Sequence, residues 1–186
     1  MKLSVYHIAA NQLRTAPILK VETESITVKT FTFKDKACAR AKPGQFLMLW
    51  IPSVDEIPLS ILDANENGIV SVAVKKVGEA TQALHNKEAG ELVGIRGPFG
   101  NSFTLKKGKI LMVGGGTGTA PLLFLAKKLT SKKEKLVFVT GAKTKEELLF
   151  IDTLKEVCGK RDLVVTTEDG SYGIKSLVNT IGISFG

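Results

Sequence analysis

A glycine-rich turn at Gly114–Pro121 (GGGTGTAP) constrains this chain more than any other feature of its sequence. The residues before it, Lys109–Val113, have the composition of a buried strand, and those after it continue as an apolar helix to about Leu129. Glycines in such a turn let backbone N–H groups approach an anion, and the helix N-terminus adds a partial positive charge. We therefore predict a diphosphate site formed by Gly114, Gly115, Gly116, Thr117, Gly118 and Pro121.

The order of residues in the turn departs from the usual dinucleotide fingerprint, because Pro121 stands where a third glycine is expected. Proline fits there, since the backbone N–H groups of the first helical turn have no partner within the helix. No Gly-Lys-Ser/Thr follows, which excludes a Walker A loop. The alternative is a tight connection between strand and helix that holds no ligand.

The second half of the chain alternates short apolar runs with helical patterns. Strands are expected at 109–113, 135–140 and 162–167, and helices at 119–129 and 145–157. Strand–helix–strand order with short loops favours a parallel sheet with helical crossovers. We therefore predict an α/β nucleotide-binding domain over residues 106–186, with the boundary at 105–108, where the hydrophobic period changes.

The first half has the alternation of β structure. Strands are expected at 23–33, 45–51, 69–77 and 92–96, and one helix at 79–87. Pro43-Gly44 introduces the second strand, and Asn67-Gly68 suits a hairpin turn. Several strands at short spacing, with turn residues between them, predict a small antiparallel barrel over residues 1–105. The expected fold class is therefore a β barrel followed by an α/β domain.

Composition places the chain among ordinary globular proteins, with 186 residues, 44% of them hydrophobic and 24% charged. No apolar run approaches the roughly 18 residues that a membrane span requires. The first residues lack a secretory signal, so we expect a cytoplasmic protein with no membrane partner. The net charge of +8 comes from scattered lysines without interleaved aromatics, so we expect no nucleic-acid partner. An anionic cofactor or an acidic partner protein would gain from this field.

Cysteine and histidine are too few for most metal or nucleophile chemistry. Cys38 and Cys158 lie far apart and form no Cys-x-x-Cys pair, so we expect two reduced thiols, no disulfide framework and no metal site. A [2Fe–2S] cluster normally takes four thiolates, which this sequence does not contain. His7 and His85 have no plausible catalytic partner, and we expect them at the surface or in packing.

Four motifs, in the same order, are similar to those of one known family. They are PGQF at 43–46, GPFGNSF at 97–103, the glycine turn with its helix, and TEDGSYG at 167–173. The chain thereby resembles the ferredoxin–NADP⁺ reductase superfamily. Within it, the resemblance is greatest to the electron-transfer subunits of dihydroorotate dehydrogenase and their relatives in NADH:ferredoxin and sulfide dehydrogenases. This resemblance implies an antiparallel FAD-binding barrel followed by an NAD(P)-binding parallel-sheet domain.

In that family a strand carrying Arg-x-Tyr-Ser or Arg-Pro-x-Ser holds the flavin, and the matching residues here are Ile57, Pro58, Leu59 and Ser60. Ile57 stands where the arginine would meet the diphosphate, and it supplies no charge. The resemblance indicates a substitute in Lys75 with the turn residues Gly78 and Thr81. By themselves, Lys75 would be an exposed strand residue and Thr81 the start of a helix. The resemblance favours FAD over FMN.

The chemistry that the resemblance implies is electron transfer. NAD(P)H docks over the glycine turn and reduces the flavin, and the electrons pass on to a partner centre. Ser60, expected near the reactive edge of the flavin, is the candidate catalytic residue. Glu168 and Asp169 follow the third parallel strand, where they either contact ribose hydroxyls or cap their loop. Acidic residues there favour NAD over NADP, whereas Lys143 after the second strand favours NADP.

The resemblance also implies parts of the nicotinamide domain that do not occur in these 186 residues. Family members continue with a Cys-Gly-Pro strand, a helix and a last strand, and the dihydroorotate-type subunits add a cysteine-rich [2Fe–2S] loop. We therefore expect either a truncated product or half of a split protein completed by a partner. The expected partner is a catalytic dehydrogenase subunit or another redox protein in a hetero-oligomer. The rival interpretation is a non-catalytic flavin- or nucleotide-binding module.

Overall fold

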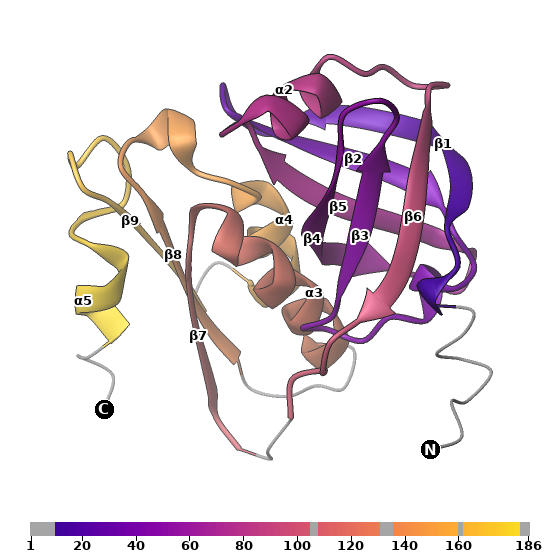
Figure 1. Ribbon diagram of the computed structural model, residues 1–186. Coiled ribbons are helices and arrows are strands. Elements are labelled where there is room, and N and C mark those ends of the chain that lie inside the picture. Colours follow the sequence, from indigo (N-terminus) through magenta and orange to yellow (C-terminus); the bar gives the residue numbers. More distant parts are fainter. Residues whose placement is uncertain (1–9, 105–107, 131–135, 160–161, 183–186) are drawn as a thin grey trace. The chain divides into compact units, whose positions relative to one another are not determined.

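The computed structural model of this protein describes residues 10–104, 108–130, 136–159 and 162–182 (Figure 1). The described residues form two compact units. The first holds the residues up to Thr23 together with Val28–Phe103, and the second holds Glu24–Thr27 together with the residues from Thr104 on. The boundary predicted at 105–108 lies, apart from Gly108, outside the described residues.

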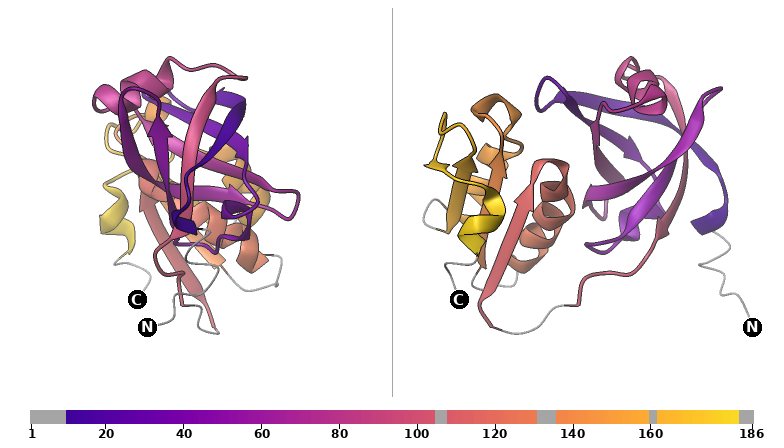
Figure 2. Two further views of the ribbon diagram at one scale, coloured as in Figure 1. Left: turned by 45° about the vertical axis from the view of Figure 1, so that its right-hand side comes forward. Right: turned by 60° about the vertical axis from the view of Figure 1, so that its left-hand side comes forward.

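The first unit is a closed antiparallel barrel with the strand order β1-β2-β5-β4-β3-β6. Its strands are β1 (Arg14–Thr23), β2 (Val28–Lys34), β3 (Phe46–Ile51), β4 (Asp55–Ala64), β5 (Ile69–Lys75) and β6 (Leu92–Phe99). The short helix η1 (Cys38–Arg40) follows β2, and helix α2 (Glu79–His85) follows β5. Figure 2 shows the sheet closing on itself, so that each of these strands has a neighbour on both sides.

Alternation of side chains decides which residues fill the barrel. In β3 the inward residues are buried and the outward residues are half-buried; the inward set is Leu47, Leu49 and Ile51, and the outward set is Phe46, Met48 and Trp50. Phe31 and Phe33 of β2 are fully buried in the same interior. Burying one such side chain contributes roughly 1.5–3 kcal/mol. The barrel interior is therefore the main source of stability of this unit.

A partly buried ion pair connects the start of β1 to segments elsewhere in the barrel. Arg14 donates from Nε to Asp35 Oδ2 at 2.6 Å and from Nη2 to Asp35 Oδ1 at 3.1 Å. Arg14 Nη2 also donates to the carbonyl oxygen of Gly97 at 3.1 Å, and Asp35 accepts the Cys38 N–H at 2.7 Å. Burial alone would raise the pKa of Asp35, but the hydrogen bonds from Arg14 and Cys38 outweigh it and lower that pKa below its ordinary value.

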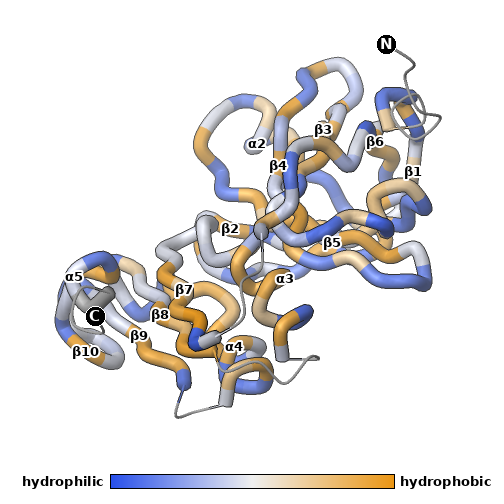
Figure 3. The backbone as a smooth tube through the Cα atoms, turned by 90° about the horizontal axis from the view of Figure 1, so that it is seen from below, coloured by the Kyte–Doolittle hydropathy of each residue, from blue (hydrophilic) through white to orange (hydrophobic). Residues whose placement is uncertain are grey.

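The second unit contains a parallel sheet with the strand order β10-β9-β8-β7. Its strands are β7 (Ile110–Gly115), β8 (Leu136–Ala142), β9 (Leu163–Thr167) and β10 (Ile174–Lys175). Its helices are η2 (Gly116–Gly118), α3 (Thr119–Thr130), η3 (Lys145–Glu147), α4 (Ile151–Cys158) and α5 (Val178–Gly182). Strands β7, β8 and β9 are largely apolar (Figure 3), as is usual for parallel strands that helices cover.

Glycines let helices pack against both faces of this sheet at its carboxyl end. A Cβ atom at Gly114 would lie 2.9 Å from Leu122 of α3, whereas one at Gly115 would lie 3.3 Å from Val178 of α5. Since neighbouring side chains of a strand point to opposite faces, α3 and α5 cover opposite faces of the sheet, as Figure 1 shows. Gly141 of β8 pairs with Gly115 and also faces Val178.

A buried hydroxyl lies under the contact between α5 and the sheet. Thr166 of β9 is 1% exposed, and its Oγ1 has no hydrogen-bond partner among the described residues. This oxygen lies next to Gly141, where an added Cβ would be only 2.3 Å from it. An unsatisfied buried hydroxyl costs about 1–3 kcal/mol. The packing of α5 on the sheet therefore leaves the Thr166 hydroxyl without a hydrogen bond, and the apolar contacts of α5 offset this cost.

The predicted fold class, a barrel followed by a parallel sheet, is confirmed. Strands β1 and β4 were not predicted from their patterns, because Pro17 and Pro58 interrupt them and proline argues against a strand. The helix predicted at 145–157 is wrong as a single element: it is broken between η3 and α4, where Phe150 has a φ of 59°. Strand β10 and helix α5 are too short to give a periodic signal and were not predicted.

Replacing Gly141 with alanine should destabilise the second unit. The added Cβ would lie 2.3 Å from Thr166 Oγ1, 3.0 Å from Val178 Cβ and 3.1 Å from the Thr166 carbonyl oxygen, so β9 or α5 must move. We expect a loss of about 1–3 kcal/mol in the free energy of unfolding, measured by urea denaturation. Gly118→Ala is the matched control, because a Cβ there meets no atom within 4 Å. Equal losses in the two variants would contradict the packing argument.

The Asp35 carboxylate should make the stability of the barrel depend on pH in the acidic range. Because the pKa of Asp35 is lowered by folding, its contribution is fully present above the unfolded-state pKa of about 3.9 and is lost as the pH falls through the folded-state pKa. Asp35→Asn should therefore lower the free energy of unfolding at neutral pH, and the difference from the parent chain should shrink in acid. Asp55→Asn, at an exposed position, is the control. A difference that stays constant down to about pH 2 would refute this account.

Candidate functional site

Three of the sequence motifs meet at one end of the barrel. In the register of β3, Phe46 pairs with Ser60 of β4 on one side and with Phe99 of β6 on the other. The rings of Phe46 and Phe99 have their centroids 5.8 Å apart. The motif at 43–46, the strand segment at 57–60 and the motif at 97–103 are therefore neighbours in the structure, although they are far apart in the sequence.

Hydrogen bonds and one glycine hold these segments together. Gln45 Nε2 donates to the Gly100 carbonyl oxygen at 2.9 Å, and the Phe103 N–H donates to the Pro43 carbonyl oxygen at 2.9 Å. Gly100 has a φ of 79°, and a Cβ there would lie 3.1 Å from the Phe46 ring. Residues of the motifs at 43–46 and 97–103 therefore hold β3 against the segment that follows β6.

The residues predicted to bind a flavin lie along β4. Pro58 and Ser60 are exposed, and Leu59 is half-buried. The Ser60 hydroxyl is therefore accessible at the end of the barrel where the Phe46 and Phe99 rings lie. Ile57 is half-buried and brings no charge to this surface.

The predicted substitute for the missing arginine lies at the end of a neighbouring strand. Lys75 is the last residue of β5, which pairs with β4, and Lys75 is exposed. Gly78 follows shortly after it, and a Cβ there would meet no atom within 4 Å. A cationic side chain and an open stretch of backbone are therefore close together in the chain, and both suit an anionic ligand.

The Thr81 hydroxyl serves the turn itself. Its Oγ1 donates to the Gly78 carbonyl oxygen at 2.9 Å and accepts the N–H groups of Val77 and Gly78 at 2.9 and 3.0 Å. A hydroxyl has a single hydrogen to donate, and here that hydrogen is used inside the turn. Of the two roles that the sequence allowed for Thr81, this geometry favours the start of the helix over direct contact with a phosphate.

His85 packs inside the barrel unit. It is 8% exposed, its Nε2 lies 2.8 Å from the Val74 carbonyl oxygen, and its ring centroid lies 6.1 Å from that of Phe31. Burial lowers the pKa of His85, and the positive charges of Lys29 and Lys76 act in the same direction. The packing role expected for His85 fits these contacts, and His7 lies outside the described residues.

The residues predicted to contact a nucleotide lie at the carboxyl edge of the parallel sheet. Gly115, Ala142 and Thr167 end the strands β7, β8 and β9, and the register pairs Ala142 with Thr167. The glycine turn, Lys143 and Glu168 follow these three strand ends directly. Ligands of open parallel sheets bind at this edge, so the fold brings all three predicted segments to the expected place.

The glycine turn is open to a ligand on its outer side, and the buried Thr119 holds it in place on the side facing the sheet. A Cβ at Gly116 or at Gly118 would meet no atom within 4 Å. Behind the turn, the buried Thr119 Oγ1 donates to the Gly114 carbonyl oxygen at 3.2 Å and lies 3.2 Å from Thr140 Oγ1 of β8. Bare backbone on a fixed base fits a diphosphate. The remaining predicted residues lie at the end of β7 (Gly115), in η2 (Thr117) and in the first turn of α3 (Pro121).

The two acidic residues of the loop after β9, Glu168 and Asp169, have different surroundings. Asp169 Oδ1 accepts the Ser171 N–H at 2.9 Å and the Ser171 hydroxyl at 2.7 Å, and these hydrogen bonds lower the pKa of Asp169. Ser171 Oγ in turn accepts the Lys145 N–H at 2.8 Å, which links this loop to the one after β8. Asp169 therefore caps its loop, whereas Glu168 is exposed at the sheet edge.

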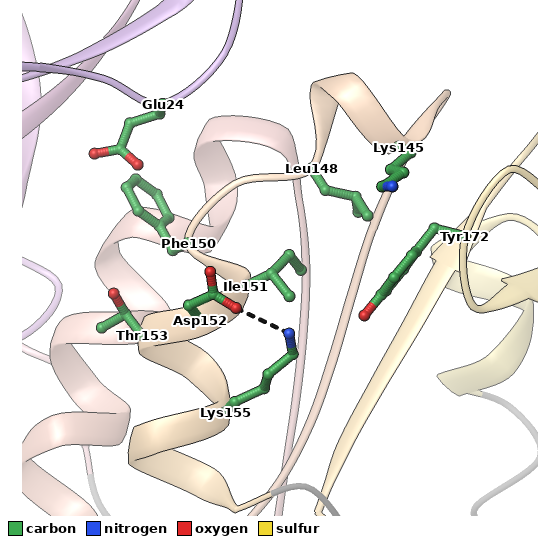
Figure 4. A pocket seen from close by; sticks show the side chains of 9 residues that line it. All are labelled: Glu24, Lys145, Leu148, Phe150, Ile151, Asp152, Thr153, Lys155 and Tyr172. Atoms are coloured by element: carbon green, nitrogen blue, oxygen red, sulfur yellow. Dashed lines mark hydrogen bonds and ion pairs between the residues drawn. The ribbon is translucent and has the colours of Figure 1, made fainter.

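A pocket lies between α4 and the loop after β9 (Figure 4). Between these two segments, the residues that line the pocket are Lys145, Leu148, Phe150, Ile151, Asp152, Thr153, Lys155 and Tyr172. Lys155 Nζ donates to Asp152 Oδ1 at 2.9 Å, and this bond raises the pKa of Lys155, with Tyr172 acting in the same direction. Sequence reasoning placed Tyr172 in a motif but gave it no role, since only the fold brings it to α4.

Within the part of the chain that the structure describes, no group of three or more His, Cys, Asp or Glu residues could hold a metal ion. Cys38 and Cys158 are free thiols, and burial raises the pKa of both. The described helices include none that is both long enough and apolar enough to cross a membrane.

Comparison with known proteins finds similar chains. The family model of the oxidoreductase NAD-binding domain matches residues 112–178. A probable dihydroorotate dehydrogenase B (NAD(+)) electron transfer subunit of Methanocella arvoryzae is 39% identical over 167 residues, which cover 90% of this chain. The protein of the same description from Pyrococcus horikoshii is 42% identical over 148 residues, or 80% of this chain. The chain spans 62% and 55% of the lengths of these two relatives.

Solved structures also resemble this chain. The structure of an NADH-dependent reduced ferredoxin–NADP oxidoreductase matches with a TM-score of 0.82 and 31% identity, covering 91% of this chain and 62% of that one. Phthalate dioxygenase reductase matches with a TM-score of 0.73 and 21% identity, covering 85% of this chain and 52% of that one. The second likeness is one of fold alone.

Thr81→Val should loosen the turn before α2. Valine keeps the branched shape but removes the hydroxyl that makes three hydrogen bonds with Val77 and Gly78. We expect a loss of about 1–2 kcal/mol in the free energy of unfolding, measured by urea denaturation. Thr81→Ser, which keeps the hydroxyl, should retain most of the stability. A Thr81→Val variant as stable as the parent chain would show that the hydroxyl does not hold the turn.

Proposed function

We propose that this chain is a member of the ferredoxin–NADP⁺ reductase superfamily, to which it is similar in sequence and fold, and that it transfers electrons between NAD(P)H, a bound flavin and a partner redox protein. One observation carries the proposal: the open glycine turn and the exposed Glu168 both lie at the carboxyl edge of a parallel sheet. The same chain also contains a barrel on which Ser60 is exposed. The names of the relatives favour an electron-transfer subunit of dihydroorotate dehydrogenase, in pyrimidine biosynthesis.

We assign flavin binding to the barrel, with FAD as the flavin. Ser60 would contact the reactive ring, flanked by Pro58 and Leu59 on β4, and Lys75 and Gly78 would meet the diphosphate. Bound flavin supplies the transfer of one or two electrons, which side chains of this protein do not provide. The chain's own part is to hold and orient the flavin, with Ser60 as the proposed catalytic residue. Because Ile57 carries no charge, the affinity for FAD rests more heavily on Lys75 than it would beside an arginine.

We assign the pyridine nucleotide to the carboxyl edge of the sheet. The backbone around Gly116 and Gly118 would receive the diphosphate, on the base that Thr119 fixes. Glu168 would contact the ribose hydroxyls, while Asp169 holds the loop in shape. A carboxylate at the ribose repels a 2′-phosphate, and the relatives are named for NAD(+). The proposed nucleotide is therefore NAD rather than NADP.

The proposed partner is a catalytic dehydrogenase subunit, so that the working protein is a hetero-oligomer. The relatives are named as subunits, which supports a partner without identifying it. The [2Fe–2S] cluster expected from the resemblance has no ligand set among the described residues, and no step is assigned to one. We include a cytoplasmic location in the proposal, since free thiols are usual in a reducing compartment.

A second candidate is a reductase subunit that exchanges electrons with ferredoxin. The 31% identity to an NADH-dependent reduced ferredoxin–NADP oxidoreductase favours it. The two candidates share the barrel and sheet assignments and differ in the acceptor. Electron transfer from the NADH-reduced chain to ferredoxin, compared with transfer to a dihydroorotate dehydrogenase catalytic subunit, separates them.

The proposal is tested by mixing the purified chain with FAD and then with NADH in the absence of oxygen. Uptake of FAD should quench the fluorescence of Trp50, the single tryptophan, which lies on the outer face of β3 like Phe46. NADH should then bleach the visible absorption of the flavin. A chain that takes up FAD but is not bleached would be a non-catalytic binding module, and a chain that binds neither molecule would contradict the proposal.

Gly118→Ala should weaken the binding of NADH without affecting the fold. A Cβ there meets no protein atom within 4 Å, so only a bound ligand would collide with it. We expect Kd for NADH to rise about tenfold or more, which is about 1.4 kcal/mol, while FAD uptake stays unchanged. Gly78→Ala is the matched variant on the barrel and should weaken FAD but not NADH. Titration calorimetry measures both, and two variants that bind like the parent would exclude these turns as the sites.

A further inference from the structure

The loops that follow β8 and β9 stay joined beyond the ends of these strands. The register pairs Ala142 with Thr167, the last residues of β8 and β9. Beyond this pair, the Glu168 N–H donates to the Ala142 carbonyl oxygen at 3.2 Å. The Asp169 N–H donates to the Lys143 carbonyl oxygen, also at 3.2 Å. The backbone that carries the exposed Glu168 side chain is therefore held against the loop after β8.

The chain then turns at Gly170, and a side chain makes the next connection between the loops. Gly170 has a φ of 82°, and its N–H donates to the Thr167 carbonyl oxygen at 3.3 Å. Past the turn, Ser171 Oγ accepts the Lys145 N–H at 2.8 Å. Lys145 is the first residue of η3, where a backbone N–H has no partner within its own helix. The Ser171 hydroxyl therefore takes the place of a main-chain carbonyl in joining the two loops.

Asp169 orients the Ser171 hydroxyl. Ser171 Oγ donates its single hydrogen to Asp169 Oδ1 at 2.7 Å, and the same carboxylate oxygen accepts the Ser171 N–H at 2.9 Å. Because that hydrogen is directed at a carboxylate, the lone pairs of Ser171 Oγ are left to accept the Lys145 N–H. Asp169 directly follows Glu168 in the chain. The contacts of Ser171 therefore fix the backbone on the carboxyl side of Glu168.

We propose that Ser171 is a positioning residue that makes the pyridine-nucleotide site prefer NAD to NADP. It acts through Glu168: by joining the two loops, it holds the Glu168 carboxylate where the ribose of the nucleotide binds. The inference rests on the assignment of Glu168 to the ribose under the proposed function, and Ser171 itself is assigned no contact with the nucleotide. A binding group that is held in place before its ligand arrives reduces the ordering cost of binding.

Loss of this positioning differs from a general loosening of the site. A carboxylate held at the ribose accepts hydrogen bonds from its hydroxyls and repels a 2′-phosphate. If the loop is released, Glu168 loses its contacts with NAD and also moves away from the phosphate of NADP. The affinity for NAD then falls while the affinity for NADP does not. A general loosening would instead weaken both nucleotides alike, so the ratio of the two Kd values separates the two cases.

The test measures Kd for NAD⁺ and NADP⁺ by titration calorimetry, with the whole chain loaded with FAD. Oxidised nucleotides leave the oxidised flavin unchanged during the titration. We expect the parent chain to prefer NAD⁺, and Ser171→Ala to reduce this preference about fivefold, mainly by raising Kd for NAD⁺. Ser171→Thr keeps the hydroxyl and should keep the preference. Ser176→Ala is the matched control, because the Ser176 hydroxyl donates only to the carbonyl oxygen of the next residue, Leu177.

A double-mutant cycle shows whether Ser171 acts through Glu168. Glu168→Gln should itself reduce the preference for NAD⁺, because it removes the charge that repels the 2′-phosphate. In that background Ser171→Ala should change the preference little, since there is no carboxylate left to position. Equal effects of Ser171→Ala with and without Glu168→Gln would overturn the proposal.

Hydrogen exchange of the chain without nucleotide tests the positioning itself. The Lys145 amide should exchange faster in Ser171→Ala than in the parent chain, because it loses its acceptor. An unchanged rate would overturn the proposal, as would a Ser171→Ala chain that binds both nucleotides more weakly but keeps its preference. A parent chain that binds neither nucleotide, or that prefers NADP⁺, would contradict the proposed nucleotide site as well. A parent chain that prefers NAD⁺ and keeps this preference in Ser171→Ala would overturn the positioning alone.

Discussion

Two helices approach opposite faces of the same strand end, and they do so because no side chain stands at Gly114 or Gly115. The turn, the helix α3 and the carboxyl edge of the sheet all take their positions from this packing. The glycines of the motif fall into two groups, according to whether a side chain at that position would meet other protein atoms. Gly114, Gly115 and the neighbouring Gly141 are required by protein atoms, whereas Gly116 and Gly118 meet none within 4 Å. Gly116 has a φ of 53°, a backbone conformation that favours glycine, whereas neither a protein contact nor a positive φ requires glycine at Gly118.

The barrel shows the same division between residues that shape the site and residues that are left free. Gly100 lets the segment after β6 lie against Phe46, and the Thr81 hydroxyl holds the turn before α2. Ser60 and Lys75 are exposed, whereas Gly78, also exposed, is held by its backbone hydrogen bonds with the Thr81 hydroxyl. A motif match alone does not separate these groups, because both kinds of residue belong to the same short segments.

Much of the fold and part of the site could be predicted from the sequence, where the signal is local. The strand, glycine turn and helix predicted the start of the parallel-sheet domain, and the alternation of apolar residues predicted most of the barrel. The choice between the two roles of Asp169 depends on Ser171 and on the loop after β8, so it required the structure. The same holds for the ion pair of Arg14 and Asp35, since nothing in their local patterns connects them.

The unpartnered hydroxyl of Thr166 makes the attachment of α5 the weak point of the sheet. If α5 lifts away, this hydroxyl gains a hydrogen bond to water, which offsets part of the apolar contact that is lost. Local opening of a protein begins where detachment costs the least free energy. We therefore expect local opening of the second unit to begin at α5.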